Sequence, residues 1–125
     1  MISIDLKTFI EEYWEAISGF PKTPALLRRY IVDDDLIGHV MAFEASFPCY
    51  ELIADEMICE ADKVSVIGRF KGTHEGEIMG MAATGKKVNI PFSVIYQVEY
   101  DKIVKSWLFL DQMELMRQLG LMNNN

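Results

Sequence analysis

Asp111 can exchange a proton with a bound ketone if its carboxylate faces a pocket. An apolar surround raises the pKa of a carboxyl group toward the range in which it works as a general acid and base. The same residue also begins the run Asp111-Gln112-Met113-Glu114, which is typical of a helix capping box. Capping needs only an acceptor near the amides of Met113 or Glu114. The sequence therefore leaves a catalytic and a capping role open for Asp111.

The only two histidines are the other candidates for carbonyl chemistry. His39 lies one helical turn after Leu36 and one turn before Phe43, so we expect its imidazole in or beside an apolar interior. There it can polarise a carbonyl or act as a hydrogen-bonded core residue. His74 stands in a glycine-flanked turn, where it can contact a ligand or be an exposed turn residue. Asp111 and His39 are thus the catalytic candidates, and His74 is a candidate ligand contact.

Six aromatic side chains can line a pocket for a flat organic molecule, because aromatic walls suit such ligands. Aromatic residues in such a set more often form hydrophobic core. In a cone-shaped fold, the inner face of the sheet can be partly core and partly pocket wall. We expect about half of them to reach the pocket wall, as in other ligand clefts. The candidates are Tyr13, Trp14, Phe43, Phe92, Tyr96 and Trp107.

The cysteines and histidines do not form a metal-binding pattern. Cys49 and Cys59 are ten positions apart with no second pair, which excludes a Cys-x-x-Cys motif and a zinc framework built from them. His39 and His74 are too far apart in the chain for a His-x-x-x-His motif. The sequence therefore predicts no metal and no cofactor, and two reduced cysteines.

Composition and charge narrow the class of protein. Half of the 125 residues are apolar and a quarter are charged, which is the balance of a globular domain. The net charge of -7, with no basic cluster, disfavours nucleic acid as a partner. No stretch approaches the length of a membrane span, and the start, Met1 to Lys7, lacks the pattern of a signal peptide. We therefore expect a cytoplasmic protein that binds neither nucleic acid nor membrane.

Three helices are predicted in the first forty per cent of the chain. Apolar residues at three- and four-residue steps favour a helix from Leu6 to Ile17, which ends before Gly19. Thr23 and Pro24 read as an N-cap followed by proline at the first position of a short helix that ends near Val32. A third helix starts at the acidic residues 33–35 and ends before residue 48.

After residue 48 the period changes to two, which indicates strands. Residues 64–71 alternate, and residues 87–100 place one apolar face, which includes Tyr100, toward the core. A tight turn then leads into residues 103–110, whose two faces are both apolar. These faces are Ile103, Trp107 and Phe109 on one side, and Val104, Leu108 and Leu110 on the other. We expect this strand to be covered on both sides and to be followed by a short helix that begins after Asp111.

Helices first and antiparallel strands afterwards predict an α+β fold, in which helices cover one side of a sheet. No repeat, linker or low-complexity segment divides the chain, so we expect one domain over residues 1–125.

Short motifs in the second half resemble the SnoaL-like polyketide cyclase, or ester cyclase, family of the NTF2-like superfamily. The resemblance lies in their order and spacing, and it covers about half of the chain. The motifs are Gly72-Thr73-His74-Glu75-Gly76-Glu77, Gly80, Thr84-Gly85-Lys86-Lys87-Val88, Ile103-Val104-Lys105-Ser106-Trp107, Asp111 and Gln118-Leu119-Gly120. Two motifs depart from the family pattern: its Glu-His-Trp reads Lys105-Ser106-Trp107 here, and its Pro-Pro-Thr-Gly reads Ala82-Ala83-Thr84-Gly85.

The resemblance implies a cone, in which a strongly bent antiparallel sheet wraps around the N-terminal helices. It also implies a homodimer joined through the outer sheet face, and a strand with two apolar faces agrees with that. Family members resemble cofactor-free aldolases that close a polyketide ring with an aspartate as acid and base, and Asp111 occupies the matching position.

Three functions remain open from the sequence. The first is a cofactor-independent enzyme that acts on an apolar carbonyl compound by aldol, isomerase or hydrolase chemistry with Asp111. The second is a non-catalytic module that binds a small apolar organic ligand, since fold alone does not establish a reaction. The third is an interaction protein whose pocket is filled by its own side chains.

Overall fold

Three helices lie in the N-terminal part of the chain, as the apolar spacing predicts. In this computed structural model, which describes residues 5–120, they are α1 (Leu6–Ile17), α2 (Pro24–Leu27) and α3 (Asp34–Ser46). The predicted N-cap Thr23 is confirmed, because its side chain accepts a hydrogen bond from the Leu26 amide, and Asp5 and Asp33 cap α1 and α3 in the same way. The expectation of a cytoplasmic protein rests partly on the start of the chain, and residues 1–4 of that segment lie outside the described residues. No helix among residues 5–120 is long and apolar enough to cross a membrane.

The second helix is shorter than predicted. It ends at Leu27, and the chain continues in turns instead of reaching Val32 as a helix. The Ile103 amide donates to the Tyr30 carbonyl, and the Val32 amide donates to the Ile103 carbonyl. These two bonds attach the segment to the sheet, so its backbone groups are satisfied without further helix.

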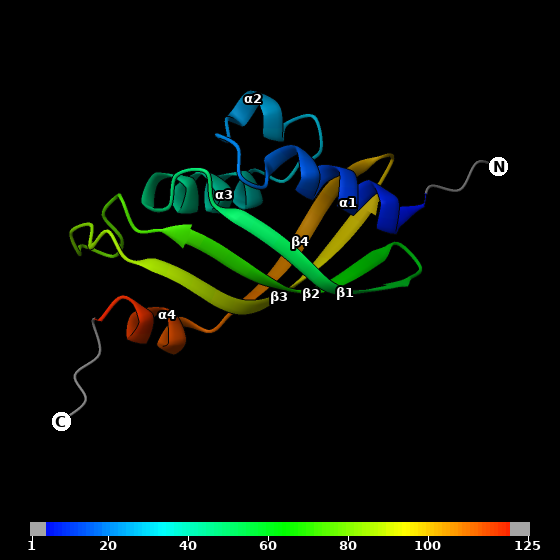
Figure 1. Ribbon diagram of the computed structural model, residues 1–125. Helices are drawn as coiled ribbons and strands as arrows, with labels where there is room; N and C mark the ends of the chain where they lie inside the picture. The colour runs from blue at the N-terminus through cyan, green and yellow to red at the C-terminus, as the bar shows by residue number, and fades with distance from the viewer. Residues whose placement is uncertain (1–4, 121–125) are drawn as a thin grey trace.

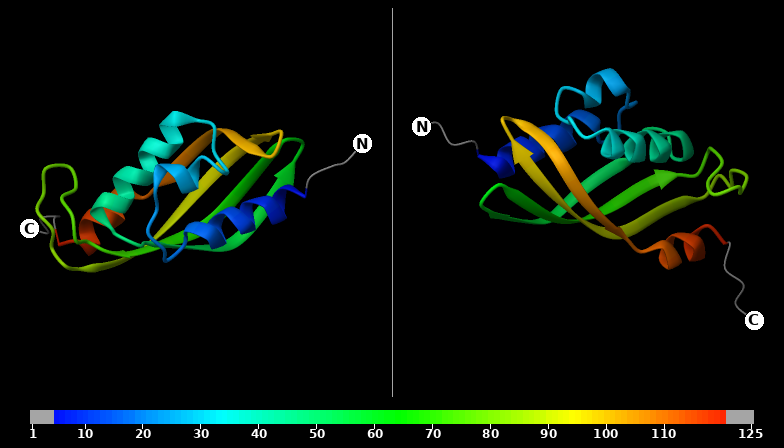
Figure 2. Two further views of the ribbon diagram at one scale, coloured as in Figure 1. Left: turned by 90° about the horizontal axis from the view of Figure 1, so that it is seen from above. Right: turned by 180° about the vertical axis from the view of Figure 1, so that it is seen from behind.

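Four antiparallel strands follow in sequential order. They are β1 (Glu51–Glu60), β2 (Lys63–Thr73), β3 (Lys87–Glu99) and β4 (Lys102–Leu110), and the short helix α4 (Gln112–Gln118) comes last. The sheet is strongly bent, with α1 and α3 across its concave face and α4 at one end (Figure 1). The view from above shows that α1 and α3 lie over different parts of the sheet (Figure 2). The predicted α+β arrangement of a bent sheet around N-terminal helices is confirmed.

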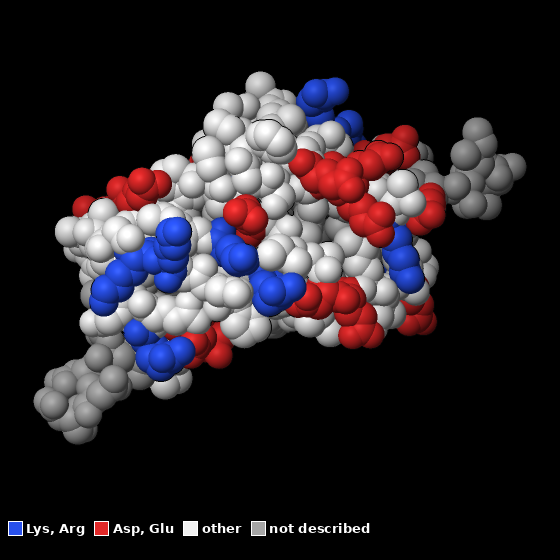
Figure 3. Space-filling model, in the orientation of Figure 1, with Lys and Arg blue, Asp and Glu red and all other residues white. Residues whose placement is uncertain are grey.

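The core lies between the helices and the concave face of the sheet. Alternate residues of β2 and β3 are buried there, as their period of two predicts. The core residues of these strands are Val64, Val66, Phe70, Val88, Ile90, Phe92, Val94, Tyr96 and Val98. Ile10, Tyr13, Trp14 and Ile17 of α1 pack against them. Acidic side chains gather over the opposite, exposed side of α1 (Figure 3).

The sequence patterns did not reveal β1. This strand has one neighbour in the sheet and is mostly exposed, so it lacks a continuous buried face. A β-bulge between Ala54 and Glu56 also shifts its register against β2. Because a bulge exchanges inward and outward positions, the period-two signal is lost within the strand.

The predicted faces of β4 are wrong, because a second bulge changes which of its residues point to the same side of the sheet. Gln97 pairs with Lys105, whereas the next residue, Val98, pairs with Ile103. Ile103 therefore faces the core, and Trp107 and Phe109 face outward instead of sharing its side. Tyr100 also departs from the expectation: it lies in the β3–β4 turn with a φ of 51° and is 95% exposed.

The chain turns beneath β3 after β4 ends. Pairing with β4 begins at Phe92, so the earlier part of β3 has a free edge. The side-chain amide of Gln118 occupies that edge: Oε1 accepts from the Asn89 amide at 2.7 Å, and Nε2 donates to the Asn89 carbonyl at 2.8 Å. Gln118 thus takes the place of a strand neighbour and fixes α4 at the end of the sheet.

Candidate functional site

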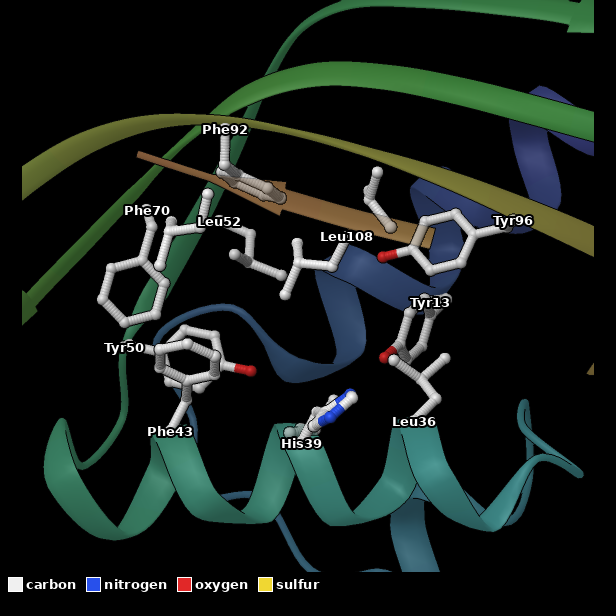
Figure 4. Close-up of a pocket in the computed structure, with 13 residues that line it drawn as sticks. Tyr13, Leu36, His39, Phe43, Tyr50, Leu52, Phe70, Phe92, Tyr96 and Leu108 are labelled. Carbon is white, nitrogen blue, oxygen red and sulfur yellow. The ribbon is translucent and has the colours of Figure 1, made fainter. Parts of the chain in front are cut away.

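The concave side of the sheet encloses a pocket beneath α3. Its wall is apolar except for one histidine and three tyrosine hydroxyls, and its cavity volume is about 50 Å³. The close-up shows side chains from α3 below and from β3 and β4 above meeting around it (Figure 4). The lining residues are Tyr13, Leu36, His39, Val40, Phe43, Tyr50, Leu52, Phe70, Phe92, Val94, Tyr96, Leu108 and Leu110.

Three tyrosines bring hydroxyl groups to this pocket from different elements. Tyr13 comes from α1, Tyr96 from β3, and Tyr50 from the residue before β1. All three are almost fully buried, and their hydroxyl oxygens point toward the middle of the pocket (Figure 4). The rings of Tyr13 and Tyr96 meet edge to face with their centroids 6.0 Å apart, which fixes both side chains.

The tyrosine hydroxyls are hydrogen-bond donors at neutral pH. Burial raises the pKa of Tyr13, Tyr50 and Tyr96 above the ordinary value of 10.0, because the phenolate would lose its hydration. The Tyr96 oxygen accepts a hydrogen bond from Trp14 Nε1 at 3.0 Å, which leaves its own proton free to donate. Protonated tyrosines can polarise a carbonyl oxygen, but they do not serve as bases at this pH.

His39 reaches the same pocket from the middle of α3. Its side chain is exposed at the pocket mouth, and the imidazole points toward the space between the tyrosines (Figure 4). The expectation of an imidazole in or beside the apolar interior is confirmed, and the alternative of a buried core histidine is wrong. An exposed imidazole beside a pocket can exchange protons with solvent and with a bound molecule.

A buried lysine that the sequence did not single out supports Tyr50. Lys22 Nζ lies 3.8 Å from the centroid of the Tyr50 ring and 3.1 Å from Glu44 Oε1. It also donates to the carbonyls of Phe20 and Tyr50, each at 3.0 Å. Burial lowers the pKa of Lys22, while Glu44 opposes that change. The ammonium group therefore holds the back of the pocket wall through one cation–π contact and three polar contacts.

The structure brings together five of the predicted site residues at this pocket: Tyr13, His39, Phe43, Phe92 and Tyr96. Trp14 stands directly behind them, stacked on Phe92 with ring centroids 5.8 Å apart. Tyr50 belongs to the same wall, but sequence reasoning missed it because β1, which follows it, was not recognised.

Trp107 and His74 lie away from the pocket lining. Trp107 is on the outer sheet face, where Lys105 Nζ sits 4.8 Å from its ring centroid. His74 is fully buried against Phe47, with ring centroids 5.4 Å apart, so its alternative as an exposed turn residue is wrong. The Thr84 amide donates to His74 Nδ1 at 3.1 Å, and Nε2 has no partner among the described residues. His74 thus closes the loop between β2 and β3.

Asp111 is the N-cap of α4. Its Oδ1 accepts a hydrogen bond from the Glu114 amide at 2.9 Å, which confirms the predicted cap, whereas the Glu114 carboxylate accepts from Arg117 and Gln118. The residue is exposed and follows Leu110, which lines the pocket, but Asp111 itself is not part of the lining. The capping role is therefore present in the fold, and a catalytic role would require the carboxylate to act at the pocket margin.

The charged side chains of the site do not converge on a metal. Among residues 5–120, no three His, Cys, Asp or Glu side chains lie close enough together to hold an ion. The pocket lining contains one imidazole and no carboxylate or thiol. The side chains around the pocket are therefore suited to an uncharged organic molecule with a hydrogen-bond acceptor.

Comparisons with known proteins agree with this geometry. The family model described as SnoaL-like polyketide cyclase matches residues 22–119. No curated protein matches the chain significantly. TsrD from Streptomyces laurentii has a similar structure, with a TM-score of 0.80 and 20% identity over 96% of this chain and 100% of that chain.

Two further solved structures have the same architecture. IdmH from Streptomyces antibioticus, a suggested polyketide cyclase, gives a TM-score of 0.77 and 21% identity over 94% of this chain and 99% of its own. AclR from Streptomyces galilaeus, a suggested hydroxylase, gives 0.80 and 20% identity over 95% of this chain and 83% of its own. At these identities the likeness is one of fold, and the fold is the NTF2-like cone.

Proposed function

The chain belongs to the family of SnoaL-like polyketide cyclases, and from this premise we propose that its central pocket binds a small apolar carbonyl compound. The observation that carries the proposal is the convergence of three buried tyrosine hydroxyls in an otherwise apolar pocket. A carbonyl oxygen accepts hydrogen bonds from such donors, and the apolar wall accommodates the rest of the molecule. The pocket lining offers no fixed charge for a strongly ionic ligand.

A second candidate function is acid–base chemistry on the bound carbonyl compound. His39 favours it, because this imidazole lines the pocket and points toward the space between the tyrosines. Donation by tyrosines to a carbonyl oxygen makes the neighbouring C–H bonds more acidic, and a nearby base can then remove a proton. Such a reaction needs no cofactor. Asp111 is the alternative base that the family resemblance implies.

Replacing Tyr13 by Phe tests the binding proposal. We expect the affinity for 2-acetylnaphthalene to fall about fivefold, because one hydrogen bond to its carbonyl oxygen is lost. The affinity for 2-isopropenylnaphthalene, in which a CH₂ group replaces that oxygen, should stay unchanged. Both affinities can be measured by calorimetric titration. An equal loss for the two probes would show that Tyr13 provides only shape.

Replacing Asp111 by Asn in the same titrations separates its two roles. Asn and Asp cap helices about equally well, so stability should change by only a few tenths of a kcal/mol and probe affinity should stay the same. Once a turned-over carbonyl compound is found, a rate loss on the order of 100-fold in this variant would assign the acid–base role to Asp111. Unimpaired turnover would eliminate Asp111 as the base and leave His39.

We also propose that two copies associate through the outer sheet face. Apolar side chains from all four strands adjoin there. Ile67 and Phe109 both pair with Ser93, Ile95 pairs with Trp107, and Ile58 and Ile95 both pair with Ser65. A contiguous apolar surface of this kind usually marks an interface. We call it the outer patch, and its members are Ile58, Ile67, Ile95, Trp107 and Phe109.

Sedimentation should therefore show a dimer at micromolar concentration, and Phe109→Lys should convert it to a monomer. A lysine would bring a charge into an apolar interface, where its desolvation is unfavourable. Phe20→Lys is a matched control, because Phe20 is 57% exposed and Phe109 is 59% exposed, but Phe20 lies outside the outer patch. A monomeric wild-type protein would contradict the proposed interface.

A further inference from the structure

The free edge of β1 is covered by a side chain at its beginning and open further along. The Leu52 amide donates to Ser18 Oγ at 2.9 Å, and Ser18 Oγ donates to the Leu52 carbonyl at 3.3 Å. Both backbone groups of Leu52 therefore point away from β2. Such outward pairs recur at every second residue of an antiparallel strand, so Ala54 presents its amide and carbonyl at the same edge, just before the bulge.

A groove of about 250 Å³ lies beside these backbone groups, between α1 and β1. Its floor is apolar and includes Trp14, whose indole is fixed by the hydrogen bond to Tyr96 and by stacking on Phe92. Gly68 lets this indole approach the sheet, because a Cβ atom there would lie 3.2 Å from Trp14 Cη2. The other apolar side chains of the groove are Leu52, Ala54 and Met57.

The rim of the groove is acidic. Glu11 and Glu15 line it from α1, where they lie one helical turn apart and are both exposed. The residues that line the groove include no lysine or arginine. Acidic side chains also gather over this side of α1 (Figure 3). A rim of this charge attracts a basic segment and repels an acidic one.

We propose that this groove binds an extended, lysine- or arginine-rich segment of a partner protein, which places one apolar side chain on the groove floor. The backbone of the segment bonds to the free groups of Ala54, as in the addition of a strand to a sheet edge. Its apolar side chain covers Trp14, and its basic side chains lie near Glu11 and Glu15. A second copy of this chain is a poor occupant, because its own free-edge strand is acidic.

Titration of the ¹⁵N-labelled protein with acetyl-Lys-Lys-Leu-Lys-Lys-amide, followed by NMR, tests the proposal. We expect the signals of the Ala54 amide and of the Trp14 indole N–H to shift, because both groups contact the peptide. A peptide with glycine in place of leucine should bind about tenfold more weakly, since the floor is left uncovered. A peptide with glutamate in place of every lysine should cause no shift of these signals.

Glu15→Lys and Glu12→Lys are a matched pair of variants. Both residues are exposed on α1 and both substitutions change the net charge equally, but only Glu15 lines the groove. We expect Glu15→Lys to weaken the lysine peptide about fivefold or more, and Glu12→Lys to leave its affinity within about twofold.

Equal losses in the two variants would overturn the proposal, because they would show attraction to the overall charge alone. Binding of the glutamate peptide would overturn it as well, and so would shifts that leave Ala54 and Trp14 unmoved. The absence of any shift with the lysine peptide at millimolar concentration would also decide against the groove.

Discussion

The protein is expected to lose about 4 kcal/mol of stability for each pH unit above about 10.5, through the three tyrosines of the pocket. Burial raises the pKa of Tyr13, Tyr50 and Tyr96 in the folded state. The unfolded chain therefore releases three protons near pH 10 that the folded chain retains. Because the unfolded state then binds fewer protons, the tyrosines contribute their full stabilisation below about pH 10. This contribution to the free energy of unfolding falls as pH rises.

Urea midpoints measured across this alkaline range test the expectation. The lowered pKa of Lys22 acts in the opposite direction, since between that folded pKa and about pH 10.5 the unfolded chain holds a proton that the folded chain has lost. Tyr50→Phe should reduce the slope above that pH by about a third. Phenolate absorbance gives a second readout, in which the three buried tyrosines ionise only together with unfolding. A constant urea midpoint through this range would contradict their burial.

Phe92→Ala is expected to destabilise the fold by about 3 kcal/mol, through lost burial and a cavity on the inner face of β3. Phe92 is 8% exposed and stacks on Trp14. Gln97→Ala is the control on the same strand, because Gln97 faces outward and its side chain makes one hydrogen bond, to Asp62 Oδ2 at 2.9 Å. Denaturant midpoints compare the two variants. Equal losses would mean that the faces of β3 are assigned incorrectly.

The regular helices and strands could be predicted because each buries one face, and that face fixes the spacing of the apolar residues along the chain. The first helix buries Ile10, Tyr13, Trp14 and Ile17 at helical spacing, and β3 buries every second residue from Val88 to Val98. Where a single face meets the core, sequence period and structure coincide. The caps were predictable for a similar reason, since a capping side chain bonds only to its own first turn.

The bulges of β1 and β4 could not be predicted in the same way. Each changes which residues point inward, as the separation of Ile103 from Trp107 shows, and no residue type marks the change. Tyr100 continued the alternation of β3 perfectly, yet the turn had already begun there with a positive φ. Pairing between strands determines the two bulges and the end of β3. The pattern of residues within one strand carries no information about that pairing.

The candidate site was predictable where it coincides with core periodicity. Tyr13, Phe43, Phe92 and Tyr96 were found because inward-facing aromatics of a cone also line its pocket. Lys22 and Tyr50 were missed, because a lone lysine near a proline and a tyrosine beside an unrecognised strand give no signal of mutual contact. The resemblance singled out Asp111 and His74, and these two residues organise α4 and the β2–β3 loop.

The irregular first strand has a consequence for misassembly. β1 has one neighbour in the sheet, so its other side could template the addition of a foreign strand. Glu51, Asp55, Glu56 and Glu60 place four acidic side chains along it, and its bulge interrupts the row of backbone groups. Two such strands brought edge to edge would juxtapose like charges and mismatched donors and acceptors. The strand is thereby protected from growing into fibrils, and acidification, which neutralises carboxylates, would weaken that protection.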